Sequence, residues 1–377
     1  MKTCFIVARF SKNQVGLLDF SYRIKALKKK FKLTIVINIP VNHIELQVAG
    51  AEYIFLPESE GRFGWLRYCW DSARLIRKRK PNVAILLNSS VAPVSIMTRG
   101  VPTSLYWNEH PTHFTGLLEG VNHIKCAAKA ALRWLLYHGA RKSTLVMPIG
   151  EALYEDLLAH GCDLAKLRLI YMGVDSIFNE VGIVDAHEKD DHPLELIYIG
   201  SVTKERGRDV MLEALAMANM EGEIARLTII GACADQQKYC AKHARQFGIA
   251  DSVVVHGRVP GQAIPFFLKN ADAGLCLWEN QPWWRFNPPT KLFEYLVAGL
   301  PVIASNIRTH TRYIRHGYNG LIFEYDSVNL TQAIQMMWER RKELPALKKR
   351  AFESSTPYLW GNIEPVFLES IERIAGK

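Results

Sequence analysis

The stretch FNPPTKLFEYLVAGLPVIAS, residues 286–305, decides the fold of this 377-residue chain. Pro288 and Pro289 come just before a predicted helix, where the fixed φ of a proline suits the first turn and its missing N–H is not needed. The segment Gly299-Leu300-Pro301 ends that helix and leads into a short apolar run. A helix that feeds directly into a buried strand is typical of a parallel α/β sheet.

The same alternation of short apolar runs and helical patterns extends outward from this stretch. Strands are predicted in the first half at 3–9, 33–39, 82–88, 103–107 and 143–149, and in the second at 194–200, 226–232, 252–257, 273–278 and 301–305. Helical patterns lie between them, for example FSYRIKALKKKF at 20–31 and RDVMLEALAMA at 208–218. The fold class predicted is α/β, with two Rossmann-like doubly wound domains, and ligands of such sheets bind beyond the carboxyl ends of the strands.

Chain length and an acidic stretch predict where the domains meet. At 377 residues the chain exceeds the usual size of a single hydrophobic core. EVGIVDAHEKDDHP is polar, acidic and without hydrophobic periodicity, which is typical of a linker. We therefore expect an N-terminal domain at 1–180, a linker at 181–193, a C-terminal domain at 194–355, and a final helix at 356–377 that packs back on the N-terminal domain.

Composition excludes several other classes of protein. Hydrophobic residues make up 49% and charged residues 22%, which are globular values. The apolar run after the N-terminus is too short for a signal peptide, and no stretch approaches the roughly 20 apolar residues that span a bilayer. Seven scattered cysteines without a C-x-x-C pair predict reduced thiols rather than a disulfide framework or a zinc site. We expect a cytoplasmic protein.

The positive charge is confined to the first half. Residues 1–180 hold 24 Lys and Arg against 14 Asp and Glu, whereas the remainder has 23 of each. The basic residues gather in KALKKKFK at 25–32 and RLIRKRK at 74–80. Aromatic residues lie in or near these runs: Phe31, Trp65, Tyr68 and Trp70. We expect an anionic membrane surface to meet this half, the alternatives being solvated helix faces or a protein docking surface. No nucleic-acid-binding motif accompanies the charge, so no nucleic acid is expected as a partner.

A glycine turn with cationic neighbours follows the predicted strand at 194–200. Gly200 lets the backbone approach a ligand, and Ser201, Lys204 and Arg206 supply a hydroxyl and two cations where phosphates could lie. The spacing is not G-x-G-x-x-G, which disfavours a nicotinamide dinucleotide. By itself a basic turn of this kind is usually only solvated.

The helix that opens near Thr290 offers a second candidate site. Free N–H groups at a helix start can bind a diphosphate, and Lys291 lies beside them. Glu294 lies one turn further on. Helix periodicity alone favours the simpler interpretation that Glu294 and Lys291 are exposed surface neighbours.

Together these segments resemble the retaining glycosyltransferases of family 4, also called glycosyl transferases group 1. The matching segments follow in order: Arg206-Gly207, LTIIG at 227–231, VVVHGRVP at 253–260, NADAGLCL at 270–277, the stretch at 290–305 and NGLIF at 319–323. The first half matches chiefly in LIYMGVDSIF at 169–178. The resemblance implies the GT-B fold, in which two Rossmann-like domains face each other across a cleft. It makes residues 1–180 the acceptor-side domain and residues 194–355 the domain that binds the nucleotide-sugar donor.

The resemblance also implies roles for individual residues of the donor domain. Glu294 takes the position of the glutamate that binds the donor ribose, and a carboxylate suits a vicinal diol. Arg258 and Val259 fall in the loop that meets the nucleobase. Arg206 takes the position of the basic residue that neutralises the leaving diphosphate.

One further role falls in the first half of the chain. His110, after the predicted strand at 103–107, matches a histidine that faces the donor sugar; a loop histidine bonded to backbone is the alternative.

Two departures from the family pattern concern the donor sugar. The family has a second glutamate eight positions before the first, and here that position is Phe286, with Asn287 beside it. Asn287 can still read sugar hydroxyls, because an amide both donates and accepts hydrogen bonds. Ser201 replaces the arginine that follows the first glycine, which leaves Lys204 as its substitute.

The activity implied is transfer of a hexose, with retention, from a UDP- or GDP-linked donor to an acceptor sugar that could be lipid-linked, in bacterial surface polysaccharide or glycolipid assembly. No Asp-x-Asp occurs, so we expect no metal and no cofactor, with Arg206, Lys204 and Lys291 neutralising the diphosphate. Two alternatives share the fold: a catalytically inactive protein that binds sugar nucleotides, favoured by Ser201 and Phe286, and an epimerase acting on a UDP-sugar.

Overall fold

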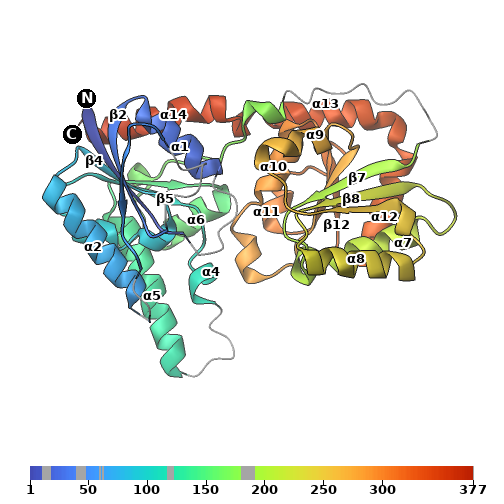
Figure 1. Cartoon of the computed structure of the whole chain (residues 1–377), viewed down its shortest axis with the longest axis horizontal. Helices are drawn as coiled ribbons and strands as arrows, with labels where there is room; N and C mark the ends of the chain where they lie inside the picture. The colour runs from blue at the N-terminus through green and yellow to red at the C-terminus, as the bar shows by residue number, and fades with distance from the viewer. Residues whose placement is uncertain are drawn as a thin grey trace. The chain divides into compact units, whose positions relative to one another are not determined.

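The computed structural model describes residues 1–10, 18–39, 48–58, 61, 63–116, 123–179 and 192–376 (Figure 1). These fall into two compact units, Met1–Met172 with Asn362–Lys377, and Gly173–Gly361. All of the expected linker at 181–193 except its last two residues lies outside the described residues. The domain limits therefore stay a prediction.

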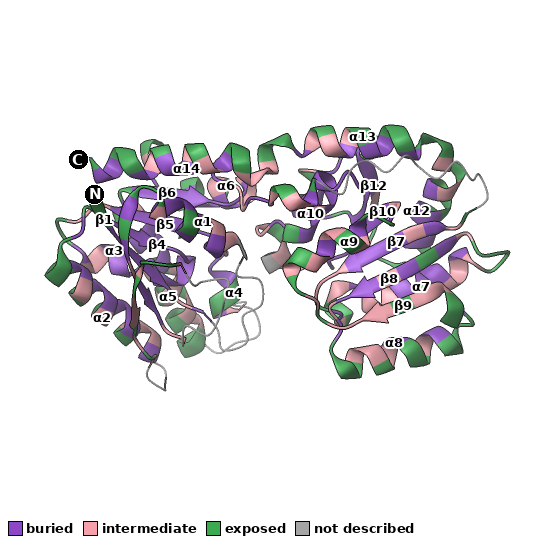
Figure 2. Ribbon diagram, turned by 45° about the horizontal axis from the view of Figure 1, so that its top comes forward, coloured by how far each residue is buried: buried purple, intermediate pink, exposed green. Residues whose placement is uncertain are grey.

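The first unit is built on a six-stranded parallel sheet with strand order β3-β2-β1-β4-β5-β6. The strands are β1 (Lys2–Ala8), β2 (Phe31–Ile37), β3 (Glu52–Phe55), β4 (Val83–Leu86), β5 (Thr103–Trp107) and β6 (Leu145–Pro148). The helices are α1 (Leu18–Lys28), α2 (Gly64–Arg79), α3 (Val94–Met97), α4 (Thr112–Thr115), α5 (His123–Lys142), α6 (Glu151–Ala159) and α14 (Trp360–Ala375), which starts in the other unit. Helices cover both faces of the sheet, and its central strands are buried (Figure 2).

The second unit repeats this plan with strand order β12-β11-β10-β7-β8-β9. Its strands are β7 (Leu194–Ile199), β8 (Ala225–Ile230), β9 (Val253–His256), β10 (Ala273–Cys276), β11 (Val302–Ser305) and β12 (Gly320–Phe323). Its helices are α7 (Arg208–Ala218), α8 (Ala234–Gln246), α9 (Ile264–Leu268), α10 (Thr290–Val297), α11 (Arg308–Thr311), α12 (Ser327–Glu339) and α13 (Leu344–Ser354). Helices α7, α8 and α12 lie on one side of the sheet, and α9, α10 and α13 on the other (Figure 1).

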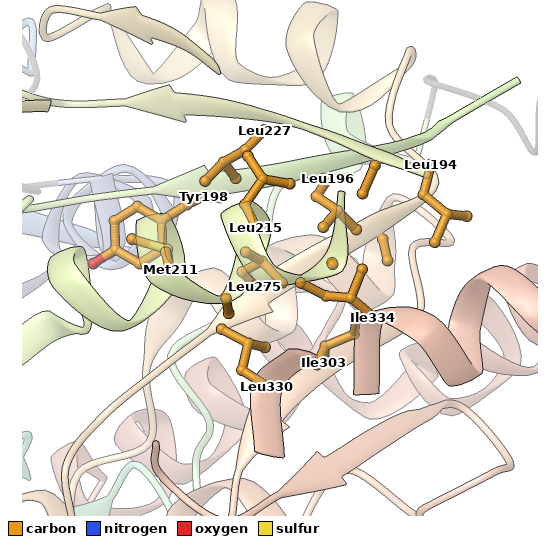
Figure 3. Close-up of a cluster of buried hydrophobic side chains, with 14 of the residues drawn as sticks. Leu194, Leu196, Tyr198, Met211, Leu215, Leu227, Leu275, Ile303, Leu330 and Ile334 are labelled. Carbon is orange, nitrogen blue, oxygen red and sulfur yellow. The ribbon is translucent and has the colours of Figure 1, made fainter. Parts of the chain in front are cut away.

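The core of the second unit explains why its strands read as continuous apolar runs. Strand residues Leu196 and Leu275 pack against Leu215 of α7 and Ile334 of α12 (Figure 3). Because helices cover both faces, inward and outward side chains of a strand are buried alike. The predicted α/β class, with two doubly wound parallel sheets, is confirmed.

Three details of the first unit differ from the sequence prediction. The helix predicted over 20–31 ends at Lys28, because Phe31 is fully buried and pairs with β1 as the first residue of β2. Edge strand β3 was not predicted. The final helix begins at Trp360, five residues before Pro365. All seven cysteines are free thiols.

Candidate functional site

The turn after β7 approaches the start of α10 closely. Gly200 has a φ of +126°, and a Cβ on it would lie 3.3 Å from Nζ of Lys291. Gly207, which ends the short helical turn Lys204–Arg206, has a φ of +81°, and a Cβ there would lie 2.7 Å from Cβ of Leu277. Both positions need glycine because of their positive φ. In addition, a side chain at position 200 would crowd Lys291, and one at position 207 would clash with Leu277.

Lys291 is buried in the first turn of α10, with 7% of its surface exposed. Its ammonium lies 3.6 Å from the centre of the Tyr198 ring and has no hydrogen-bond partner among the described residues. Burial lowers the pKa of Lys291 from 10.5 to about 7, and the nearby charge of Arg206 acts in the same direction. A buried amine without a partner is destabilising, and an anion is the ligand that would satisfy it.

Arg206 is held by two tryptophan rings. Its guanidinium lies 5.0 Å from the ring centre of Trp278 and 4.5 Å from that of Trp284. The two indoles stack on each other with their centres 4.5 Å apart. Within the described part of the chain the guanidinium makes no ion pair or hydrogen bond, so its N–H groups remain able to bind an anion.

Glu294 is partly buried one turn beyond Lys291. Burial raises the pKa of Glu294 from 4.5 to about 7, against the opposing effect of the Lys291 charge. The next residue, Tyr295, fixes the helix to the sheet, because its hydroxyl accepts a hydrogen bond of 2.9 Å from the Ile199 N–H. A Cβ on Gly274 of β10 would lie 2.4 Å from the Tyr295 ring, so α10 packs directly on the strands that position this site.

The other predicted donor residues are placed more loosely. Ser201 and Lys204 are exposed on the turn after β7, and Thr290 is exposed at the first position of α10. Asn287 is partly buried in the segment before α10. Four of the predicted residues lie close together around the Lys291 amine: Gly200, Arg206, Glu294 and Lys291 itself.

The expected nucleobase loop follows β9. Arg258 is exposed there and Val259 is partly buried. None of the described contacts joins either residue to Lys291 or Arg206. Their role at the base therefore stays a prediction.

His110 belongs to the first unit, in the loop after β5, and is 7% exposed. Its Nδ1 accepts hydrogen bonds from the Thr112 N–H at 3.2 Å and from the Thr112 hydroxyl at 2.6 Å. Its Nε2 lies 3.2 Å from the Tyr137 hydroxyl, which donates to Asp156 at 2.6 Å. Both ring nitrogens thus have partners in their own unit, as in the alternative of a loop histidine bonded to backbone. Its role at the donor sugar stays a prediction.

Sequence reasoning missed the two indoles and Tyr198. The segment WENQPWWRF, residues 278–286, holds three tryptophans in nine positions, and that density was the available signal. It was overlooked because spacing does not tell which ring meets Arg206. No group of three metal-ligating side chains occurs among the residues that the structure describes.

Two Rossmann-like units in one chain are the architecture of the GT-B fold. The chain matches HepE from Anabaena in complex with UDP with a TM-score of 0.75 and 14% identity, covering 99% of this chain and 100% of that one. It matches sucrose-phosphate synthase from Thermosynechococcus elongatus with a TM-score of 0.76 and 14% identity, covering 100% of both chains. At these identities the similarity shows the fold, and the predicted GT-B fold is confirmed.

Residues 183–354 match the family model of Glycosyl transferases group 1. The matched segment lies within the second unit, and for this segment the resemblance noted in the sequence is confirmed. Among curated relatives it is similar to the amylovoran biosynthesis glycosyltransferase AmsK of Erwinia amylovora, with 25% identity over 180 residues, or 48% of this chain and 43% of AmsK. It is also similar to the putative colanic acid biosynthesis glycosyltransferase WcaL of Escherichia coli, with 25% identity over 44% of this chain and 40% of WcaL. The match thus spans less than half the length of either relative.

Proposed function

We propose that the protein transfers a sugar from a nucleotide-diphospho-sugar to an acceptor. The observation that carries this proposal is the buried ammonium of Lys291, which has no hydrogen-bond partner among the described residues and lies near the charge of Arg206 at the carboxyl end of β7. Two cations suit the two negative charges of a diphosphate. The match to the glycosyltransferase family model supports a sugar nucleotide over other diphosphates.

The same geometry supports proposals for the remaining parts of the donor. Glu294 lies one turn beyond Lys291 and would accept hydrogen bonds from the ribose hydroxyls. The N–H groups at the start of α10, from Thr290 onward, would bind phosphate oxygens together with Lys291. Lys204, exposed on the turn after β7, is free to reach the leaving phosphate in place of an arginine at Ser201.

The reaction follows from where charge develops. As the bond to the anomeric carbon breaks, negative charge grows on the leaving diphosphate, and Arg206 and Lys291 stabilise it there. The acceptor proton passes to the leaving phosphate oxygen on the same face, so the anomeric configuration is retained. The match to the family model supports this stereochemical course and a hexose as the transferred group. Asn287, with His110, is assigned to the sugar hydroxyls.

The acceptor is proposed to be a sugar in bacterial surface polysaccharide or glycolipid assembly. The names of AmsK and WcaL, which refer to amylovoran and colanic acid biosynthesis, support this assignment. A growing polysaccharide of this kind is often lipid-linked, and the basic first unit would then act as a peripheral partner of the inner face of the cell membrane. Among the described residues, no helix is both long and apolar enough to cross a bilayer.

The test is a panel of UDP- and GDP-linked hexoses, each assayed for binding by calorimetry and for transfer to lipid-linked and soluble sugar acceptors. Transfer with retention, read from the anomeric proton signals of the product, is expected with one donor. Binding without transfer or hydrolysis would indicate the catalytically inactive alternative, which Ser201 and Phe286 favour. Conversion of a UDP-sugar without any acceptor would indicate an epimerase.

A further inference from the structure

Helix α2 exposes one basic and aromatic face, which we call the α2 stripe. The stripe consists of Phe63, Arg67, Trp70, Arg74, Arg77 and Lys78. The first five are three or four positions apart in the sequence, and Lys78 directly follows Arg77. At 3.6 residues per turn they fall within an arc of about 100°. Phe63 is 76% and Trp70 54% exposed, and the arginines and the lysine are exposed with them.

The opposite face of α2 holds the helix on its unit. The buried residues of that face are Tyr68, Cys69, Ser72, Ala73 and Ile76. The Tyr68 hydroxyl donates to the Ala8 carbonyl at 2.7 Å. The orientation of the stripe is therefore fixed by the core, and Figure 2 shows α2 with its outer side exposed.

The cations of the stripe have few partners. Arg67 lies 3.8 Å from Asp71, whereas Arg74, Arg77 and Lys78 form no ion pair within the described residues. The guanidinium of Arg77 lies 5.6 Å from the Trp70 ring, which links a cation to the exposed indole. The charge of this face is thus not neutralised by the protein itself.

The other basic run, KALKKKFK at 25–32, differs because three of its lysines have partners in the first unit. Lys28 donates to the Gly50 carbonyl at 2.8 Å, Lys29 pairs with Glu364, and Lys30 lies 3.5 Å from Glu372. Three of the four aromatic side chains expected near a membrane are also buried in the first unit or hydrogen-bonded within it. Phe31 and Tyr68 are buried, and the Trp65 indole N–H donates to the Ser90 carbonyl. Only Trp70 of that set lies exposed among unpaired cations.

We propose that the α2 stripe binds an anionic phospholipid surface. This rests on the proposed function, in which the acceptor is lipid-linked. Cations attract anionic headgroups, and an exposed indole and phenyl ring favour the interface between headgroups and acyl chains. The combination fits lipid better than nucleic acid or an acidic protein, because the two large aromatic groups lie on the same face as the charge.

The experiment is co-sedimentation with phosphatidylcholine vesicles that contain or lack phosphatidylglycerol, at low and high salt. We expect the wild type to bind only the anionic vesicles and to dissociate as salt rises. Each basic residue near such a surface strengthens binding by roughly fivefold, so Arg74→Gln, Arg77→Gln and Lys78→Gln together should weaken it on the order of 100-fold. Trp70→Ser should weaken it by a further measurable factor through the lost interfacial ring.

Helix α8 supplies a matched control. Lys238, Lys242 and Arg245 are exposed on α8 at the same kind of spacing, and their change to Gln removes the same net charge. This control variant should bind as the wild type does. Equal loss in both triple variants would overturn the proposal, since net charge alone would then explain binding.

Further outcomes separate the proposal from its rivals. The proposal is overturned if the wild type stays in the supernatant at low salt, or if it binds heparin but not vesicles. It is also overturned if both the Trp70→Ser variant and the triple stripe variant bind vesicles as strongly as the wild type. The stripe variants should keep their affinity for UDP or GDP in calorimetry, because α2 belongs to the first unit whereas Arg206 and Lys291 belong to the second. Failure of the stripe therefore leaves the proposed function standing, and loss of nucleotide binding by the wild type would count against the proposed function alone.

Discussion

Replacing Lys291 with methionine should stabilise the protein while weakening nucleotide binding. Lys291 is 7% exposed, and its amine has no hydrogen-bond partner among the described residues. Methionine has a similar length and carries no charge, so it can fill the same space beside Tyr198 without the cost of desolvation. A site residue that destabilises its own fold is the expected consequence of preparing a cationic site for an anionic ligand.

The increase in the free energy of unfolding expected for Lys291→Met follows from the pKa of Lys291. The pKa of Lys291 falls from 10.5 to about 7 in the folded protein. Each pKa unit corresponds to about 1.4 kcal/mol, so the cost of the buried amine at pH 7 reaches about 4 kcal/mol. We expect Lys291→Met to raise the free energy of unfolding at pH 7 by about 2 to 4 kcal/mol.

The pH dependence identifies the group responsible. Between pH 7 and 10.5 the unfolded chain holds the Lys291 proton and the folded protein does not, so the wild type should become more stable as pH rises through this window. Glu294 acts in a different window and with the opposite sign. Its pKa rises from 4.5 to about 7, so the folded protein holds the extra proton there and stability falls as pH rises from 4.5 to 7.

The assay is urea unfolding followed by circular dichroism across these two windows, with calorimetry of UDP and GDP on the same samples. Lys291→Met should lose the rise above pH 7 and bind nucleotide about 10 to 150 times more weakly, the range for losing a hydrogen bond to a charged group. Lys204→Met is the control for the unfolding measurement, because Lys204 is exposed on the neighbouring turn and its amine is not buried. Unchanged stability together with unchanged nucleotide affinity in Lys291→Met would refute the reasoning.

Four other predictions test the same site. Glu294→Gln should weaken nucleotide affinity by about 1 to 3 kcal/mol in calorimetry, and unchanged affinity would remove Glu294 from the ribose. Arg206→Ala should lower kcat more than donor affinity in steady-state kinetics, because charge on the diphosphate grows in the transition state; equal losses would indicate plain binding. EDTA should leave transfer intact, whereas loss of activity that magnesium restores would contradict charge neutralisation by side chains. Gly207→Ala should cost about 1 to 3 kcal/mol more in urea unfolding than Gly100→Ala, since both have positive φ but only Gly207 faces Leu277, and equal costs would contradict the contact.

The parts of the fold that the sequence predicted are those fixed by local patterns. Buried strands such as β7 and β11 are continuous apolar runs, and Pro289 marks the start of α10 at Thr290 as expected. Strand β3 was missed because only four residues form it, at the edge of the sheet, with Glu52 and Phe55 both exposed. The end of α1 was predicted too late, because the helical pattern of the cationic run continues through Lys30. In the structure α1 ends at Lys28, and Phe31 pairs with β1 as part of the sheet.

The candidate site divides along the same line. Glycine at 200 and 207, the cation at 206 and the pair Lys291 and Glu294 were selected from residue type and position. Periodicity alone had favoured an exposed Lys291, and the structure buries it instead, because Tyr198 and Gly200 lie against the first turn of α10. Contacts between segments that lie far apart in the chain depend on how β7 and β10 neighbour each other in the sheet, which no local pattern encodes.

The indole pair offers a physical reason why the two departures from the family pattern can coexist with a donor site. A carboxylate near Arg206 would share its guanidinium N–H groups and part of its charge with the protein. Phe286 places no carboxylate at the position where the family pattern has a glutamate, and the guanidinium carbon of Arg206 lies over the rings of Trp278 and Trp284. A contact between a guanidinium and an aromatic ring does not use up the N–H groups, so a diphosphate can still accept hydrogen bonds from them. With Ser201 in place of an arginine, the site has fewer cations, and we infer that it compensates by keeping the charges of Arg206 and Lys291 unshared.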